Sequence, residues 1–129
     1  MNNIKLKYFS DADDFKGNMD KMNPKLLGML DPLRKTYGFP IIINSSYRSP
    51  EHPIEAAKEK PGEHAHGAAV DIKCVGGEAT YLLVAAAIKC GFKRIGISRK
   101  SNFVHLGIGT ANVAPAQVAG DDGEKEITL

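Results

Sequence analysis

Two histidines and one aspartate are concentrated in the stretch GEHAHGAAVDIK, residues 62–73. Its second part, AAVDIKC (68–74), is apolar and contains β-branched residues, which predicts an interior strand. Side chains alternate along a strand, so Asp71 shares a face with the small residue Ala69, whereas Val70 belongs to the opposite, apolar face. Imidazole and carboxylate groups are metal ligands, so a metal site is the first chemical hypothesis.

A second segment offers another ligand of this kind. FVHLGIG, residues 103–109, predicts a short strand in which His105 stands beside a glycine on a half-apolar strand. His64 lies seven residues before Asp71, which corresponds to about 23 Å in a fully extended chain. The three side chains can share an ion only if the chain turns near Gly67, and glycine permits such a turn.

The residues alone leave two interpretations open. Two imidazoles and one carboxylate, with a fourth position left to water, would make a catalytic zinc site, because a structural zinc site normally has four protein ligands. Alternatively, His64 and His66 are loop histidines. In that case Asp71 caps a strand end and His105 is a core residue with satisfied hydrogen bonds. Spacing does not decide between them, because lone histidines are common and these are dispersed.

The elements that must position these residues are helices mixed with short strands. Asn23 followed by Pro24 is a helix start, and leucines at helical spacing lead to a stop at Gly38. Pro32 predicts that this helix is kinked or split in two. The other expected elements are a strand over 40–44, a long loop of the kind that is often functional, a helix over 78–90, and strands over 93–98 and 103–109. This mixture favours an α+β fold with a small, mainly antiparallel sheet.

Composition and charge set further limits. With 129 residues, 43% of them hydrophobic, the chain can form one core. We expect one domain over 1–110 and a flexible surface tail over 111–129. The net charge of +2 comes from interspersed basic and acidic residues, which argues against nucleic-acid binding. The sequence lacks an apolar run of about 18 residues and an apolar signal segment, so we expect no membrane span and synthesis in the cytoplasm. A monomer with reduced Cys74 and Cys90 is expected.

Three motifs follow one another along the chain: NSSYRSPEH (44–52), H-x-x-G-x-A-x-D-I (64–72) and FVH (103–105). Their types and order resemble those of the zinc D-alanyl-D-alanine metallopeptidases, whose fold is shared with the hedgehog signalling domain. The likeness extends from Leu26 to Ile108. The resemblance implies a hedgehog/DD-peptidase-like fold and a peptidase that acts on the peptides of bacterial peptidoglycan.

The resemblance also implies roles for four residues. It makes His64, Asp71 and His105 the ligands of one Zn²⁺ ion and Arg48 a substrate-binding cation. A guanidinium group is a planar, permanently charged fork that suits a peptide carboxylate or carbonyl, which agrees with that role. The alternative for Arg48 is a solvated or salt-bridged arginine of the surface.

The sequence departs from the family pattern at three positions. Gly62 replaces a serine two residues before the first histidine. Asn102 and Gly107 stand where many members have an acidic residue, three before and two after the last histidine, and neither side chain can accept a proton as a general base. The catalytic base is therefore unknown, and the candidates to replace it are Glu63, His66, Asp121 and Asp122.

The expected function is zinc-dependent cleavage of peptidoglycan peptides, by a D,D-carboxypeptidase or an endopeptidase of the endolysin type. Because the sequence shows no apolar signal segment, we expect the protein to reach the cell wall after release by a lysis partner or as a bacteriophage component. The alternative is a catalytically weak or inactive zinc-binding module of the same fold that binds wall peptide, which the missing acids would permit.

Overall fold

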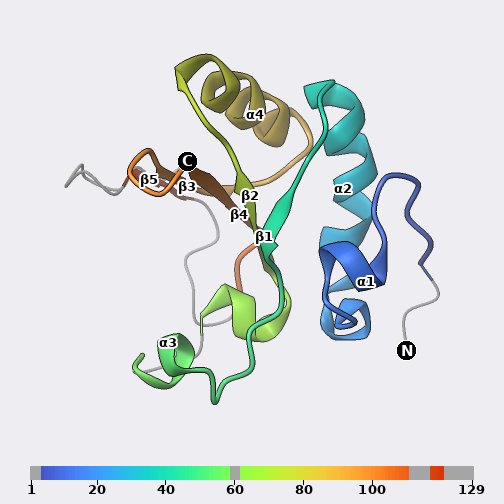
Figure 1. Cartoon of the computed structure of the whole chain (residues 1–129), viewed down its shortest axis with the longest axis vertical. Helices are drawn as coiled ribbons and strands as arrows, with labels where there is room; N and C mark the ends of the chain where they lie inside the picture. Colours follow the sequence, from blue (N-terminus) through green and yellow to red (C-terminus); the bar gives the residue numbers. More distant parts are fainter. Residues whose placement is uncertain (1–3, 59–61, 111–116, 121–129) are drawn as a thin grey trace.

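The computed structural model describes residues 4–58, 62–110 and 117–120 (Figure 1). These residues form a sheet in the order β1-β2-β4-β3-β5, with helices packed against it. The strands are β1 (Ile43–Ser45), β2 (Ala69–Lys73), β3 (Arg94–Ser98), β4 (Phe103–Gly107) and β5 (Gln117–Gly120). The helices are α1 (Asp11–Asp14), α2 (Pro24–Tyr37), α3 (Pro53–Ala56) and α4 (Gly77–Lys89), with 3₁₀ turns η1 (Met19–Lys21) and η2 (Glu63–His66). The predicted α+β class is confirmed.

One hydrophobic core joins the sheet to the two long helices, α2 and α4, which contact each other. Each fully buried leucine contributes about 1.5–3 kcal/mol relative to an exposed one, so the leucine face of α2 holds that helix in place. The buried residues of the helices and strands include Leu26, Leu27, Leu30 and Leu33 of α2, Leu83 of α4, and Val70, Ile72, Ile95, Val104 and Leu106 of the sheet.

The ends of α2 form as the sequence predicted. The Asn23 side chain accepts a hydrogen bond from the backbone N–H of Lys25 (2.8 Å), and Pro24 occupies the first turn. At the other end Gly38 adopts the left-handed conformation, with φ 84°. The helix runs through Pro32 as one element, so the split into two helices does not occur.

The first strand is displaced from its predicted position, 40–44. β1 begins at Ile43, which is buried, whereas Ile42 is 55% exposed. The apolar run therefore indicated the strand, but of its isoleucines Ile43 is buried in the core, Ile41 packs against it and Ile42 faces solvent. The β1–β2 pairing is irregular between Ile43 and Ser45, and this irregularity sets Ser45 opposite Asp71. β1 thus leads directly into the segment that borders Asp71.

The second half of the chain follows the prediction more closely. α4 covers Gly77–Lys89, one residue earlier than predicted at each end. β3 and β4 form the predicted antiparallel hairpin, and β4 also pairs antiparallel with β2. β4 therefore lies in the middle of the sheet, with a neighbour on each side that fixes its register.

The region predicted as a surface tail, 111–129, contributes a strand to the sheet. β5 pairs parallel with β3, with Gln117 opposite Arg94. A sequence of small residues without periodicity gave no signal for this strand, because its position depends on the exposed edge of β3. The rest of the predicted tail lies outside the described residues.

A tight turn at Gly67 connects η2 to β2. Gly67 has φ 64°, and its carbonyl accepts a hydrogen bond from the backbone N–H of Asn23 (2.9 Å). A Cβ atom on Gly67 would lie 2.1 Å from the carbonyl oxygen of Lys21 and 2.8 Å from Cα of Met22. Both the backbone conformation and the close approach of another chain segment therefore require glycine here.

We predict that Gly67→Ala lowers the free energy of unfolding by more than about 1 kcal/mol, because alanine is strained at positive φ and its methyl group has no room. Denaturant unfolding followed by circular dichroism measures this change. Gly28→Ala in α2 is the matched control, since an added Cβ there meets nothing within 4 Å. The control should gain about 0.5–1 kcal/mol. Wild-type stability in Gly67→Ala would contradict the described turn.

Candidate metal centre

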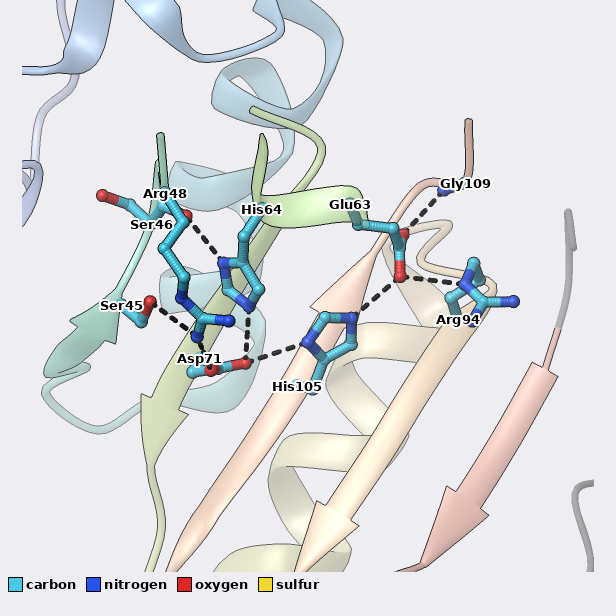
Figure 2. A network of polar contacts seen from close by, with 9 residues as sticks. All are labelled: Ser45, Ser46, Arg48, Glu63, His64, Asp71, Arg94, His105 and Gly109. Carbon is cyan, nitrogen blue, oxygen red and sulfur yellow. Dashed lines mark hydrogen bonds and ion pairs between the residues drawn. The ribbon is translucent and has the colours of Figure 1, made fainter. Parts of the chain in front are cut away.

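Three elements bring an aspartate and two histidines together (Figure 2). Asp71 of β2 and His105 of β4 are directly opposite each other in the antiparallel pairing. His64 comes from η2, and the turn at Gly67 returns the chain to β2. One ligand atom from each of the three side chains lies within 4.8 Å of the other two. The structure thus brings the three predicted ligands together, while their binding of zinc stays a prediction.

A backbone carbonyl sets the orientation of the His64 ring. Nδ1 lies 2.6 Å from the carbonyl oxygen of Ser46. A carbonyl oxygen can only accept, so Nδ1 carries a proton and donates it. In this tautomer Nε2 carries a lone pair instead of a proton. Nε2 is buried without a hydrogen-bond partner, although it lies 3.2 Å from Oδ1 of Asp71. That contact has the distance of an ion pair without the alignment of a hydrogen bond.

A carboxylate sets the orientation of the His105 ring in the same way. Nε2 lies 2.9 Å from Oε1 of Glu63, and Nδ1 lies 2.9 Å from Oδ1 of Asp71. Burial disfavours the imidazolium form, but hydrogen bonds and charges from Asp71 and Glu63 outweigh it and raise the pKa of His105 to about 9. Without a metal ion, a proton therefore stays on the ring at neutral pH and balances the two carboxylates.

The donor atoms are close enough together to share one metal ion. Two nitrogen lone pairs and one carboxylate oxygen converge, and they repel one another unless a proton or a metal cation lies among them. Ligand atoms about 2.0–2.1 Å from a tetrahedral zinc ion are about 3.3 Å apart. Oδ1 of Asp71 lies 3.2 Å from Nε2 of His64 and 2.9 Å from Nδ1 of His105. Two imidazoles and one carboxylate fit a zinc site with an open fourth position.

Asp71 is held as a carboxylate by its surroundings. Burial acts to raise its pKa, but the hydrogen bond and charge of His105, together with the close contact with His64, hold the pKa well below its usual value. Arg48 adds a further cation, with Nη2 3.6 Å from Oδ2 of Asp71 and 3.2 Å from Oγ of Ser45. The backbone N–H of Arg48 donates to the carbonyl oxygen of His64 (3.0 Å). Arg48 thus borders the cluster, as its predicted role requires, and substrate binding by it stays a prediction.

Glu63 does not have the position expected of a general base. Its Oε1 accepts hydrogen bonds from Nε2 of His105 and from Nε of Arg94 (2.8 Å). Its Oε2 accepts one from the backbone N–H of Gly109 (2.9 Å). Figure 2 shows the His105 ring between Glu63 and Asp71. Both carboxylate oxygens are therefore engaged on the side of His105 that faces away from the converging ligand atoms.

Of the other candidates for the base, only His66 lies among the described residues. Among the described residues, His66 is not one of the side chains whose ligand atoms converge. Asn102 is exposed and lies in the turn between β3 and β4, with φ 56°. Asp121 and Asp122 lie outside the described residues. The catalytic base is therefore not identified.

Sequence reasoning missed two residues of this site. The Ser46 carbonyl fixes the His64 ring, and Arg94 holds the Glu63 carboxylate. Neither has a sequence signal, because a backbone oxygen is independent of residue type and Arg94 is adjacent to Glu63 only through the strand order of the sheet.

A family comparison agrees with the geometry of the cluster. Residues 6–107, well over half of the chain, match the family model of Peptidase M15. The chain belongs to the Peptidase M15 family. This is the family of D-alanyl-D-alanine carboxypeptidases and zinc metallopeptidases with the hedgehog/DD-peptidase fold, so the predicted family and fold are confirmed. A search of curated proteins gave no match.

Nothing in the described part of this M15 domain has the form of a transmembrane helix: none of its helices is both long enough and apolar enough. The family match and the histidine–aspartate cluster together identify an M15 peptidase domain with a candidate metal site.

We predict that the metal-free protein loses stability as the pH rises from about 6.5 to above 9. The folded-state pKa of His105, about 9, is higher than its ordinary value of 6.5, so the imidazolium stabilises the fold fully below pH 6.5. This contribution disappears as the pH passes the folded pKa. A zinc ion held by His105 would take the place of the proton on Nδ1, so zinc should raise the melting temperature more at pH 8.5 than at pH 6.

Thermal unfolding followed by circular dichroism, with excess chelator or with zinc, measures both effects. His105→Gln is the control and should lose the pH dependence in this range. A metal-free melting temperature that is constant or rises between pH 6.5 and 9 would contradict the described environment of His105.

Proposed function

We propose that this M15 domain is a zinc-dependent peptidase that hydrolyses peptide bonds in bacterial peptidoglycan. The observation that carries the proposal is the buried Nε2 of His64, which has no hydrogen-bond partner and is aimed at Asp71. Leaving a polar atom unsatisfied in a protein interior is costly, by about 1–3 kcal/mol. A metal ion among the three ligands would satisfy it.

The zinc ligands in this proposal are Nε2 of His64, Oδ1 of Asp71 and Nδ1 of His105. When bound, zinc supplies a Lewis acid that polarises a peptide carbonyl and lowers the pKa of a water molecule. One backbone carbonyl and one carboxylate side chain do the positioning. Ser46 and Glu63 hold the two rings so that the correct nitrogen of each faces the ion, which keeps the ligand geometry in place before substrate binds.

Arg48 is proposed to bind the substrate. Its side chain is 17% exposed and contacts Asp71 from the long loop, so one edge of the guanidinium group can reach a ligand. Once a metal ion neutralises Asp71, the attraction between Asp71 and Arg48 weakens. The fork of Arg48 can then turn toward a carboxylate or carbonyl of the peptide.

The described residues do not supply a general base for proton transfer in this reaction. Beyond the three ligands, no described acid or imidazole joins the cluster. The proton of the attacking water would then pass to solvent or to a group outside the described residues, and the protein would lose much of the roughly 10²–10⁴-fold rate gain of general base catalysis. This supports the alternative function, a zinc-binding module that binds wall peptide with little or no turnover.

We predict that the metal-replete protein releases new amino groups from purified peptidoglycan and that a chelator abolishes this release. Arg48→Ala should keep zinc but lower turnover by about tenfold or more, and Arg48→Lys should recover only part, because the bidentate fork is lost. Amino-group assays combined with elemental analysis of each variant measure both properties.

Arg99→Ala, an exposed arginine in the turn between β3 and β4, is the matched control and should behave as wild type. Equal turnover in Arg48→Ala and wild type would remove Arg48 from substrate binding. Zinc-loaded wild type that sediments with peptidoglycan without releasing amino groups would instead favour the binding module.

A further inference from the structure

The Glu63 carboxylate is the most deeply buried charge near the cluster among the side chains drawn in Figure 2, with a side-chain exposure of 3%. Burying a carboxylate is unfavourable unless it is paired and hydrogen-bonded. Glu63 has three partners: Nε2 of His105, Nε of Arg94 and the backbone N–H of Gly109. These three hydrogen bonds compensate for the burial of the Glu63 charge and fix the position of its carboxylate beside His105.

This carboxylate occupies space that a side chain at residue 107 would fill. A Cβ atom on Gly107 would lie 1.9 Å from Oε2 of Glu63 and 2.5 Å from its Cδ. Gly107 does not have a positive φ, so its backbone does not require glycine. Residues 105 and 107 share one face of β4, because they are two apart on a strand. Gly107 is therefore needed for space: it lets Glu63 reach His105 from η2.

Neighbouring strands also leave room around the His105 ring. Gly96 of β3 lies opposite His105, and a Cβ atom on Gly96 would lie 3.2 Å from Cβ of His105. Arg94 lies opposite Gly107 in the same pairing. Gly96 thus leaves room beside His105, and the partners that define the orientation of the ring are the carboxylates of Asp71 and Glu63.

We propose that Glu63 is the positioning residue of His105. As an acceptor it keeps the ring proton on Nε2 and thereby presents Nδ1, as a lone pair, to the metal ion. Glu63 reaches the ring from η2 through the space left by Gly107. Its carboxylate thus occupies the place that an acidic side chain at residue 107 of β4 would take. This role rests on the zinc site of the proposed function, but not on peptidase turnover.

The test measures the zinc dissociation constant by competition with a chromogenic chelator, so that it does not depend on activity. Glu63→Ala should weaken zinc binding by about 10–100-fold, the usual effect of removing a carboxylate that orients a ligand histidine. Gly107→Asp alone should also impair the site, because its side chain overlaps Glu63. The double variant Glu63→Ala/Gly107→Asp should recover most of the affinity, because it returns a carboxylate to the same place.

Glu63→Gln keeps the shape of the side chain and covers the case in which Glu63→Ala does not fold. Its amide oxygen can still accept from His105, but the charge is lost, so an intermediate affinity is expected. Glu78→Ala, on exposed α4 surface, is the control and should bind zinc as wild type does. Circular dichroism confirms that each variant is folded.

Two results would overturn the proposal. One is wild-type zinc affinity in folded Glu63→Ala or Glu63→Gln, which would leave Glu63 with a structural role only. The other is a folded double variant that binds zinc no better than Glu63→Ala. Failure of the proposed peptidase function would appear elsewhere, as zinc-loaded wild type without turnover on peptidoglycan.

Discussion

The convergence of two imidazole nitrogens on one carboxylate oxygen is the constraint on which the site depends. Ser46 and Glu63 accept from the outward nitrogens, so the inward nitrogens of His64 and His105 face Asp71. Such an arrangement is stable only with a cation at its centre, whether protons or a metal ion. The β2–β4 register and the turn after η2 bring these groups together.

Two ion pairs lie beside the cluster. Two buried carboxylates, Asp71 and Glu63, are paired with Arg48 and Arg94, one arginine for each. Arg94 and Glu63 lie on the side of His105 that faces away from Asp71, where they orient the ring (Figure 2). Arg48 contacts a predicted metal ligand, so the strength of its ion pair changes when a metal binds. One ion pair thus holds the carboxylate that orients His105, while the other contacts Asp71 directly.

Much of the fold could be predicted because its signals are local. Capping residues and leucine spacing defined α2, and short apolar runs defined the β3–β4 hairpin. Other features depend on tertiary contacts that the local sequence does not show. Ile42 is exposed although it lies in an apolar run. β5 is a strand because it pairs with the edge of β3. The grouping of His64, Asp71 and His105 could be expected from the family resemblance of the motifs, but the contact of Glu63 with His105 could not. It depends on the space at Gly107, which no spacing rule shows.

The central claim is that one zinc ion binds among these three side chains, and anomalous diffraction at the zinc edge tests it most directly. Crystals of the zinc-loaded protein should give a single strong peak about 2.0–2.2 Å from Nε2 of His64, Oδ1 of Asp71 and Nδ1 of His105. Glu63 should remain hydrogen-bonded to the other nitrogen of the His105 ring. A peak at other residues, or no peak in protein soaked with excess zinc, would contradict the claim.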